Sequence, residues 1–175
     1  MANKRLRVLL EGNDDERFFE DIIKPILSPQ YDLIQVWQYA QQPRRRTKNF
    51  LRAIKAMNSH YIFLGDINKF PCVTAKIESL KNKYGRCIDA KNVTIVVKEI
   101  ESWYLAGLDD KSRKELRIRT SRDTDNITKE KFNKLIPSKF DSRIDFMIEI
   151  LKRFSIETGV QKNSSFAYFM NKILS

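Results

Sequence analysis

The sequence predicts an α/β fold, with a central parallel sheet of about four strands that is flanked by helices and followed by a helical C-terminal extension. Two observations predict it. Four short apolar runs alternate with three segments of helical spacing in the first part of the chain, a pattern that favours parallel strands joined by right-handed crossovers. After Trp103 the apolar spacing is helical to the last residues.

The strand predictions rest on short apolar runs that end at polar or glycine residues. They cover residues 5–10, 31–39, 61–64 and 93–97. Between them, i, i+3, i+4 spacing of apolar residues predicts helices at 13–27, 47–58 and 72–84. We expect Pro25 to kink or end the first of these helices and Gly85 to stop the third.

The second part of the chain predicts helices at 101–107, 128–135, 141–154 and 164–174, with a polar linker at 111–126. We therefore expect residues 1–107 to form the α/β core. Residues 108–175 would form a basic linker and helices that pack on this core, giving one compact domain.

Composition narrows the class of protein. The 175 residues are 42% hydrophobic, which is enough for a buried core, and no apolar run approaches the roughly 18 residues of a membrane span. The two cysteines, Cys72 and Cys87, flank no histidine, which argues against a zinc site or a disulfide framework. We expect a cytoplasmic protein without a membrane-spanning segment.

The net charge of +11 favours a polyanionic partner, because Lys and Arg contacts to phosphates release counterions. Residues 41–60 contain no acid at all. This stretch follows the second strand, so its basic side chains should lie near the carboxyl ends of the strands and could clamp a nucleic-acid backbone. The residues we predict for this role are Arg44, Arg45, Arg46 and Lys48. A solvated loop is the alternative.

Acidic residues end three of the four predicted strands: Glu11, Asp66, and the pair Glu99 and Glu101. In open parallel sheets the carboxyl ends of the strands form the ligand-binding edge, so these acids should converge. Several carboxylates at one point repel unless a cation neutralises them, and oxygen-rich sites suit Mg²⁺ or Mn²⁺. Lys98, beside the acids, could stabilise charge on a phosphorane. Alternatives are a local turn for Asp66 and surface ion pairs for Glu99 and Lys98.

Four segments carry motifs that follow one another in order along the chain. Residues 8–15 join an apolar strand to Glu11-Gly12 and place an acid, Asp15, four residues after the glutamate. Residues 63–68 resemble the Asp-x-Asp motif, with Asp66 in the first place and Asn68 in the second. Residues 96–106 contain a Glu-x-Glu-x-Trp-x-Leu pattern, and residues 162–169 are the fourth segment. Together the four segments resemble a Toprim-like family related to the "overcoming lysogenization defect" nucleases, in a stand-alone branch, with residues 162–169 similar to its carboxyl-terminal signature.

This resemblance implies a Toprim fold and Mg²⁺-dependent phosphodiester chemistry. Carried over, Glu11 would be a metal ligand or general acid/base, Asp66 the principal metal ligand, and Asp15, Asn68, Glu99 and Glu101 the remaining candidates. Asn68 departs from the pattern because an amide offers an oxygen but no charge, which weakens the case for two metal ions.

Three hypotheses follow. The first is a Mg²⁺-dependent nuclease that acts on DNA or RNA. The second is a Toprim module with little or no catalysis that binds nucleic acid or a separately encoded ATPase, since this chain has no Walker loop; family analogy would place it in phage defence. The third is an enzyme for small phosphate esters. Asn68 is the residue that separates the first two.

Overall fold

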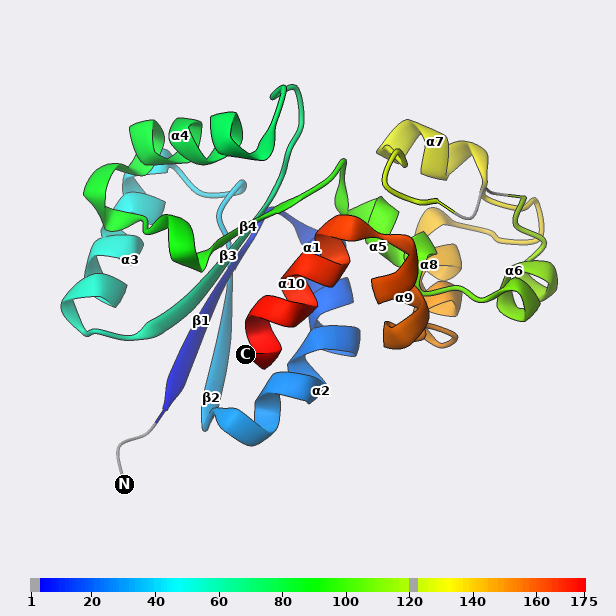
Figure 1. Ribbon diagram of the computed structural model, residues 1–175, viewed down its shortest axis with the longest axis horizontal. Helices are drawn as coiled ribbons and strands as arrows, with labels where there is room; N and C mark the ends of the chain where they lie inside the picture. Colours follow the sequence, from blue (N-terminus) through cyan, green and yellow to red (C-terminus); the bar gives the residue numbers. More distant parts are fainter. Residues whose placement is uncertain (1–3, 120–122) are drawn as a thin grey trace. The chain divides into compact units, whose positions relative to one another are not determined.

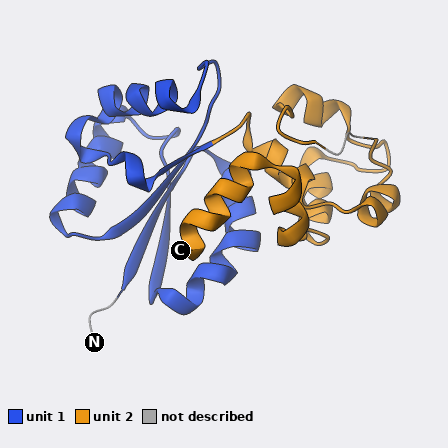
Figure 2. Ribbon diagram, in the orientation of Figure 1, with its two compact units in different colours: residues 1–95 blue, residues 96–175 orange. Residues whose placement is uncertain are grey.

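The computed structural model describes residues 4–119 and 123–175 and divides into two compact units, residues 1–95 and residues 96–175 (Figure 2). Helix α5 (Ile100–Ala106) belongs to the second unit, where it contacts α7 (Lys129–Lys134), α8 (Arg143–Leu151) and α9 (Ile156–Lys162). Residues 120–122 of the predicted linker lie outside the described residues.

The first unit is built on the expected four-stranded parallel sheet, which the structure confirms. Its strands are β1 (Arg5–Leu10), β2 (Leu33–Gln38), β3 (His60–Asp66) and β4 (Val93–Val96), in the order β2-β1-β3-β4. Strand β1 runs parallel to both neighbours, with Leu9 opposite Trp37 on β2 and Phe63 on β3. All residues of β1 from Leu6 onward are buried, as expected for a central strand.

Helices cover both faces of this sheet (Figure 1). On one face lie α1 (Asn13–Phe18), the π-helical turn η1 (Phe19–Ile23) and α2 (Lys24–Leu27). Pro25 does not end this segment, since it lies in the first turn of α2, where a backbone N–H is not needed.

The other face carries α3 (Arg44–Ala56) and α4 (Val73–Tyr84). Phe50 of α3 stacks on Trp37 with ring centroids 4.4 Å apart, and Tyr84 of α4 contacts Phe63. Helix α3 begins earlier than the predicted residue 47, so the arginines of the basic segment form its first turn rather than a loop.

The strand order creates a switch point between β1 and β3. From β1 the chain crosses to β2 on one side, and then returns past β1 to β3 on the other side. The connecting helices leave the carboxyl ends of β1 and β3 toward opposite faces, and ligands of open α/β sheets bind at such a point.

The second unit is helical: α5, α6 (Asp110–Leu116), α7 (Lys129–Lys134), α8 (Arg143–Leu151), α9 (Ile156–Lys162) and α10 (Ser164–Leu174). Its core is aromatic, with Trp103 in contact with Phe166 and Phe169. Helices α6 and α9 were not predicted, although each has a capping side chain: Asp109 accepts from Ser112 N at 2.7 Å, and Ser155 accepts from Thr158 N. Of the helices described, none combines the length and the apolar character of a membrane span.

Candidate active site

Glu11 and Asp66, at the ends of β1 and β3, meet at the switch point. The Glu11 Oε2 atom accepts a hydrogen bond from the backbone N–H of Asp66 at 3.1 Å. The same oxygen accepts from the Tyr39 hydroxyl, which follows β2, at 3.4 Å. Donors from two neighbouring strands thus orient one carboxylate oxygen of Glu11, and both bonds fall on Oε2.

Two buried acids accompany Glu11. Asp66 is 8% exposed and Asp15 is 6% exposed. Asp15 has a structural task, because its Oδ2 accepts from the backbone N–H of Gly12 at 3.3 Å and so caps the first turn of α1. Its charge also reaches the site, since it is one of the carboxylates that raise the pKa of Tyr39.

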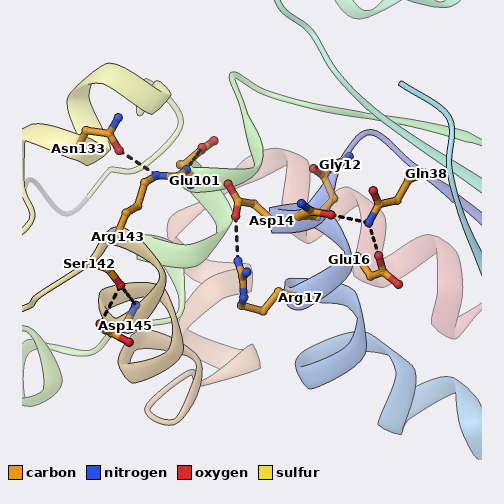
Figure 3. Close-up of polar contacts among 12 residues, drawn as sticks. Gly12, Asp14, Glu16, Arg17, Gln38, Glu101, Asn133, Ser142, Arg143 and Asp145 are labelled. Atoms are coloured by element: carbon orange, nitrogen blue, oxygen red, sulfur yellow. Dashed lines mark hydrogen bonds and ion pairs between the residues drawn. The ribbon is translucent and has the colours of Figure 1, made fainter. Parts of the chain in front are cut away.

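Other acids of α1 make local contacts. Asp14 pairs with Arg17 at 2.8 Å, and Glu16 accepts a hydrogen bond from the Gln38 side chain, which also donates to Asn13 (Figure 3). The two hydrogen bonds of Gln38 tie α1 to the edge strand β2 and help to fix the helix that begins just after Glu11.

Tyr39 is held close to Gly65. Its ring stacks on Phe63 with centroids 4.5 Å apart. A Cβ atom built on Gly65 would lie 3.0 Å from the Tyr39 hydroxyl oxygen. Burial, and then the nearby charge of Glu11, raise the pKa of Tyr39 well above its ordinary value, so this hydroxyl stays protonated and remains a donor to Glu11.

Lys76 of α4 brings a cation to the acids. Lys76 is only 9% exposed, and its Cε lies 3.9 Å from the Cβ position of Gly65, the residue before Asp66. Burial lowers the pKa of the Lys76 ammonium, while the carboxylates of Glu11 and Asp66 oppose that shift. Lys76 thus sits within electrostatic reach of both acids.

Asn68, the predicted substitute for a second carboxylate, turns its amide toward the backbone. Its Nδ2 donates to the carbonyl oxygen of Asp66 at 3.2 Å, and its φ of +52° is a left-handed conformation that Asn tolerates better than most residues. The side chain is exposed. It therefore stabilises the turn after β3.

The remaining predicted acids belong to the second unit. Glu101 is 3% exposed and forms an ion pair with Arg143, which also donates to Asn133 (Figure 3). Glu99 accepts a hydrogen bond from the backbone N–H of Lys129 and so fixes the start of α7. Both carboxylates therefore bind partners within their own unit. Lys98, which precedes Glu99 in the sequence, is exposed.

The two motifs near Trp103 and Asn163 meet in a buried polar network. Ser165 Oγ donates to Asn163 Oδ1 at 2.8 Å and accepts from Trp103 Nε1 at 2.8 Å and from the Val97 N–H at 3.2 Å. Asn163 Nδ2 in turn donates to Ser102 Oγ at 3.3 Å. This network anchors the chain where it leaves β4, so these residues serve the architecture of the second unit.

The predicted basic segment divides in two. Arg44 donates to the carbonyl oxygens of Asn82 and Lys83 at the end of α4, which neutralises the negative end of that helix. Arg46 lies over the Trp37 ring at 5.5 Å and donates to Gln42. Arg45 is exposed and Lys48 partly exposed. Arg44 is thus committed to packing, whereas Arg45 keeps its charge toward solvent.

Whether this site could bind a divalent metal ion depends on the Glu11–Asp66 pair. Across residues 4–119 and 123–175, no group of three or more His, Cys, Asp or Glu side chains is arranged to hold a metal ion. Mg²⁺, however, is usually bound by one or two carboxylates together with waters and substrate phosphates rather than by a complete protein cage. The hard oxygen donors of Glu11 and Asp66 fit that kind of site.

Tyr39 and Lys76 were not among the predicted site residues. Tyr39 directly follows Gln38, which pairs with Leu10, so the parallel register of β1 and β2 places Tyr39 beside Glu11. Lys76 looks like any lysine of an exposed helix in the sequence. Only the packing of α4 on the sheet shows that it is buried.

No family model matches the chain, and a search of curated proteins found no match. Among solved structures, the C-terminal region of the Burkholderia pseudomallei OLD protein is similar, at 16% sequence identity. The match covers 97% of this chain and 89% of that chain, with a TM-score of 0.35. A TM-score this low assigns neither fold family nor function.

Proposed function

We propose that the chain is a Toprim-like, Mg²⁺- or Mn²⁺-dependent phosphodiesterase that acts on DNA or RNA. The observation that supports it is the 3.1 Å hydrogen bond from Asp66 N to Glu11 Oε2. It brings two acids from distant parts of the chain to the point of the sheet where ligands bind. A bound Mg²⁺ would polarise a phosphate and lower the pKa of a water nucleophile.

The roles of the residues follow from their positions. Glu11 offers Oε1 as a metal ligand, because Oε2 is already occupied by its two donors. Asp66 offers the second carboxylate, and Asp15 and Asn68 are further candidates of the same unit. Glu99 and Glu101, which we expected to join them, are bonded to Lys129 and Arg143 in the second unit. Arg45, Arg46 and Lys48 would attract the nucleic-acid backbone and hold it near the carboxyl ends of the strands.

Two observations favour a second candidate, a module with little catalysis that binds nucleic acid or a partner ATPase. The Asn68 amide is bonded to the Asp66 carbonyl, and Glu101 is paired with Arg143. Asn68 has no carboxylate, and the carboxylate of Glu101 is already in an ion pair. Neither residue therefore adds a negatively charged metal ligand to the Glu11–Asp66 pair. A protein that kept this arrangement could bind a cation and a phosphate without rapid hydrolysis.

The direct test is incubation of the full chain with single-stranded DNA, double-stranded DNA and RNA in the presence of Mg²⁺ or Mn²⁺. Cleavage should require the cation and should fall by about 100-fold or more in Glu11→Gln and Asp66→Asn. Glu78→Gln is the matched control, because Glu78 is an exposed acid of α4 that pairs with Lys81. Cleavage that both site variants retain in full would refute the proposal.

A further inference from the structure

We propose that Lys76 is a built-in counter-cation of the Glu11–Asp66 pair, which keeps the affinity for divalent cations low until a phosphate group enters the site. The half of this proposal that concerns phosphate rests on the proposed function. The half that concerns cation affinity does not.

The position of Lys76 comes from contacts around Gly65. Its Cε lies 3.9 Å from the Cβ position of Gly65, whose neighbour Asp66 donates its N–H to Glu11. The absence of a side chain at Gly65 gives the lysine stem and the Tyr39 hydroxyl room beside the strand end. The Lys76 ammonium also lies 5.1 Å from the centre of the Phe70 ring, an attractive cation–π contact that favours the charged form.

A buried lysine is uncommon unless anions compensate the cost of burial. Here the two carboxylates are the anions, and their attraction opposes the lowering of its pKa by burial. A charged Lys76 removes about half of the negative charge that the pair would present to a metal. Lys76 therefore stabilises the two acids when no metal ion is bound, and it lowers their affinity for a divalent cation.

A bound phosphate group would change the balance of charge among Lys76 and the two carboxylates. A phosphate group brings negative charge that attracts both the ammonium of Lys76 and a divalent cation on the carboxylates. Once Lys76 compensates the phosphate instead of the carboxylates, it opposes the metal less, so metal and phosphate bind with a positive coupling that depends on Lys76. The substrate class that follows is a phosphodiester or phosphomonoester placed between Lys76 and the Glu11–Asp66 pair.

The test is calorimetric titration of Mn²⁺ into the full chain, for the wild type and for Lys76→Met. Methionine keeps the length of the lysine stem but not its charge. A unit charge acts on a divalent ion with twice its energy on a monovalent ion, so we expect Mn²⁺ to bind about tenfold more tightly to Lys76→Met. Lys76→Arg should keep the wild-type affinity.

Lys81→Met is the matched control, because Lys81 lies on the same helix but is exposed and paired with Glu78. It should leave the Mn²⁺ affinity unchanged. An equal or weaker affinity in Lys76→Met, with its unfolding transition still cooperative, would overturn the proposal. If Lys76→Met does not fold, the charge-retaining Lys76→Arg still decides, because a large change in its Mn²⁺ affinity also contradicts the proposal.

The phosphate half has its own readout. In the wild type, thymidine 5′-monophosphate should tighten Mn²⁺ binding, and this coupling should fall several-fold in Lys76→Met. An undiminished coupling would overturn the phosphate half alone. Failure of the wild type to cleave nucleic acid would contradict the proposed function while leaving the cation measurements intact.

Discussion

Gly65→Ala tests the packing that places Tyr39, Glu11 and Lys76 around one point. The added Cβ would lie 3.0 Å from the Tyr39 hydroxyl oxygen, closer than an ordinary van der Waals contact. Tyr39 cannot move away freely, because its ring is stacked on Phe63 and its hydroxyl donates to Glu11. Overpacking of this kind costs roughly 1–3 kcal/mol of unfolding free energy.

An opposing effect reduces the net loss. Gly65 has no left-handed φ, so alanine fits its backbone and should gain roughly 0.4–1 kcal/mol through the unfolded chain. We expect Gly65→Ala to lose about 1–2 kcal/mol overall. In a Tyr39→Phe background the clashing oxygen is gone, and the next atoms are Phe63 Cε1 at 3.6 Å and Lys76 Cε at 3.9 Å, both ordinary contacts. There Gly65→Ala should be neutral or stabilising.

The assay is a double-mutant cycle of urea unfolding, followed by circular dichroism. The gain through the unfolded chain cancels in the cycle, so the coupling energy between the two substitutions should be about 1–3 kcal/mol, above the roughly 0.3–0.5 kcal/mol scatter of independent sites. Gly12→Ala is the control, because nothing lies within 4 Å of its added Cβ, and its cost should not depend on the residue at 39. An equal cost of Gly65→Ala in both backgrounds would refute the contact geometry.

Three further predictions concern single interactions. Arg143→Met should lower the unfolding free energy by about 3 kcal/mol, because it removes the ion-pair partner of the buried Glu101, and adding Glu101→Gln should recover part of the loss in urea titrations. The raised pKa of Tyr39 keeps its proton in the native state while the unfolded phenol ionises near pH 10, so stability should fall above that pH, and the thermal midpoint of Tyr39→Phe should fall less than that of the wild type. Asn68→Asp should lose about 0.5–1.5 kcal/mol, because the donor to the Asp66 carbonyl disappears, yet should bind Mn²⁺ more tightly; a gain of cleavage would show that the missing carboxylate limits catalysis.

The sheet and its acidic edge could be predicted because they depend on local patterns. Short apolar runs that end in an acid indicate buried strands, and parallel order then brings Glu11 and Asp66 to one edge without any knowledge of side-chain packing. The contact between Glu11 and the backbone of Asp66 agrees with that reasoning. Helix α3 begins before its predicted start, a difference that arises because its first turn is purely basic, a composition that helix N-termini usually avoid.

The partners of the other acids could not be read from the sequence. Arg143 lies 42 residues after Glu101, and nothing in the spacing of charges distinguishes it from the other basic residues of the second unit. Trp103 is buried in the core, and its hydrogen bond to Ser165 connects residues 62 apart. Such pairings arise from the packing of helices, which sequence periodicity does not specify.

Glu11→Gln separates the structural use of this residue from its use as a ligand. A glutamine side chain keeps a carbonyl oxygen that can accept from both Asp66 N and the Tyr39 hydroxyl, the two bonds that now fall on Oε2. Stability should therefore change by no more than about 1 kcal/mol. The amide lacks the negative charge that attracts a divalent cation, so Mn²⁺ affinity should fall by at least about tenfold. If Glu11→Gln instead unfolds the protein but leaves cation binding intact in the folded fraction, Glu11 is an architectural acid and the metal must lie elsewhere.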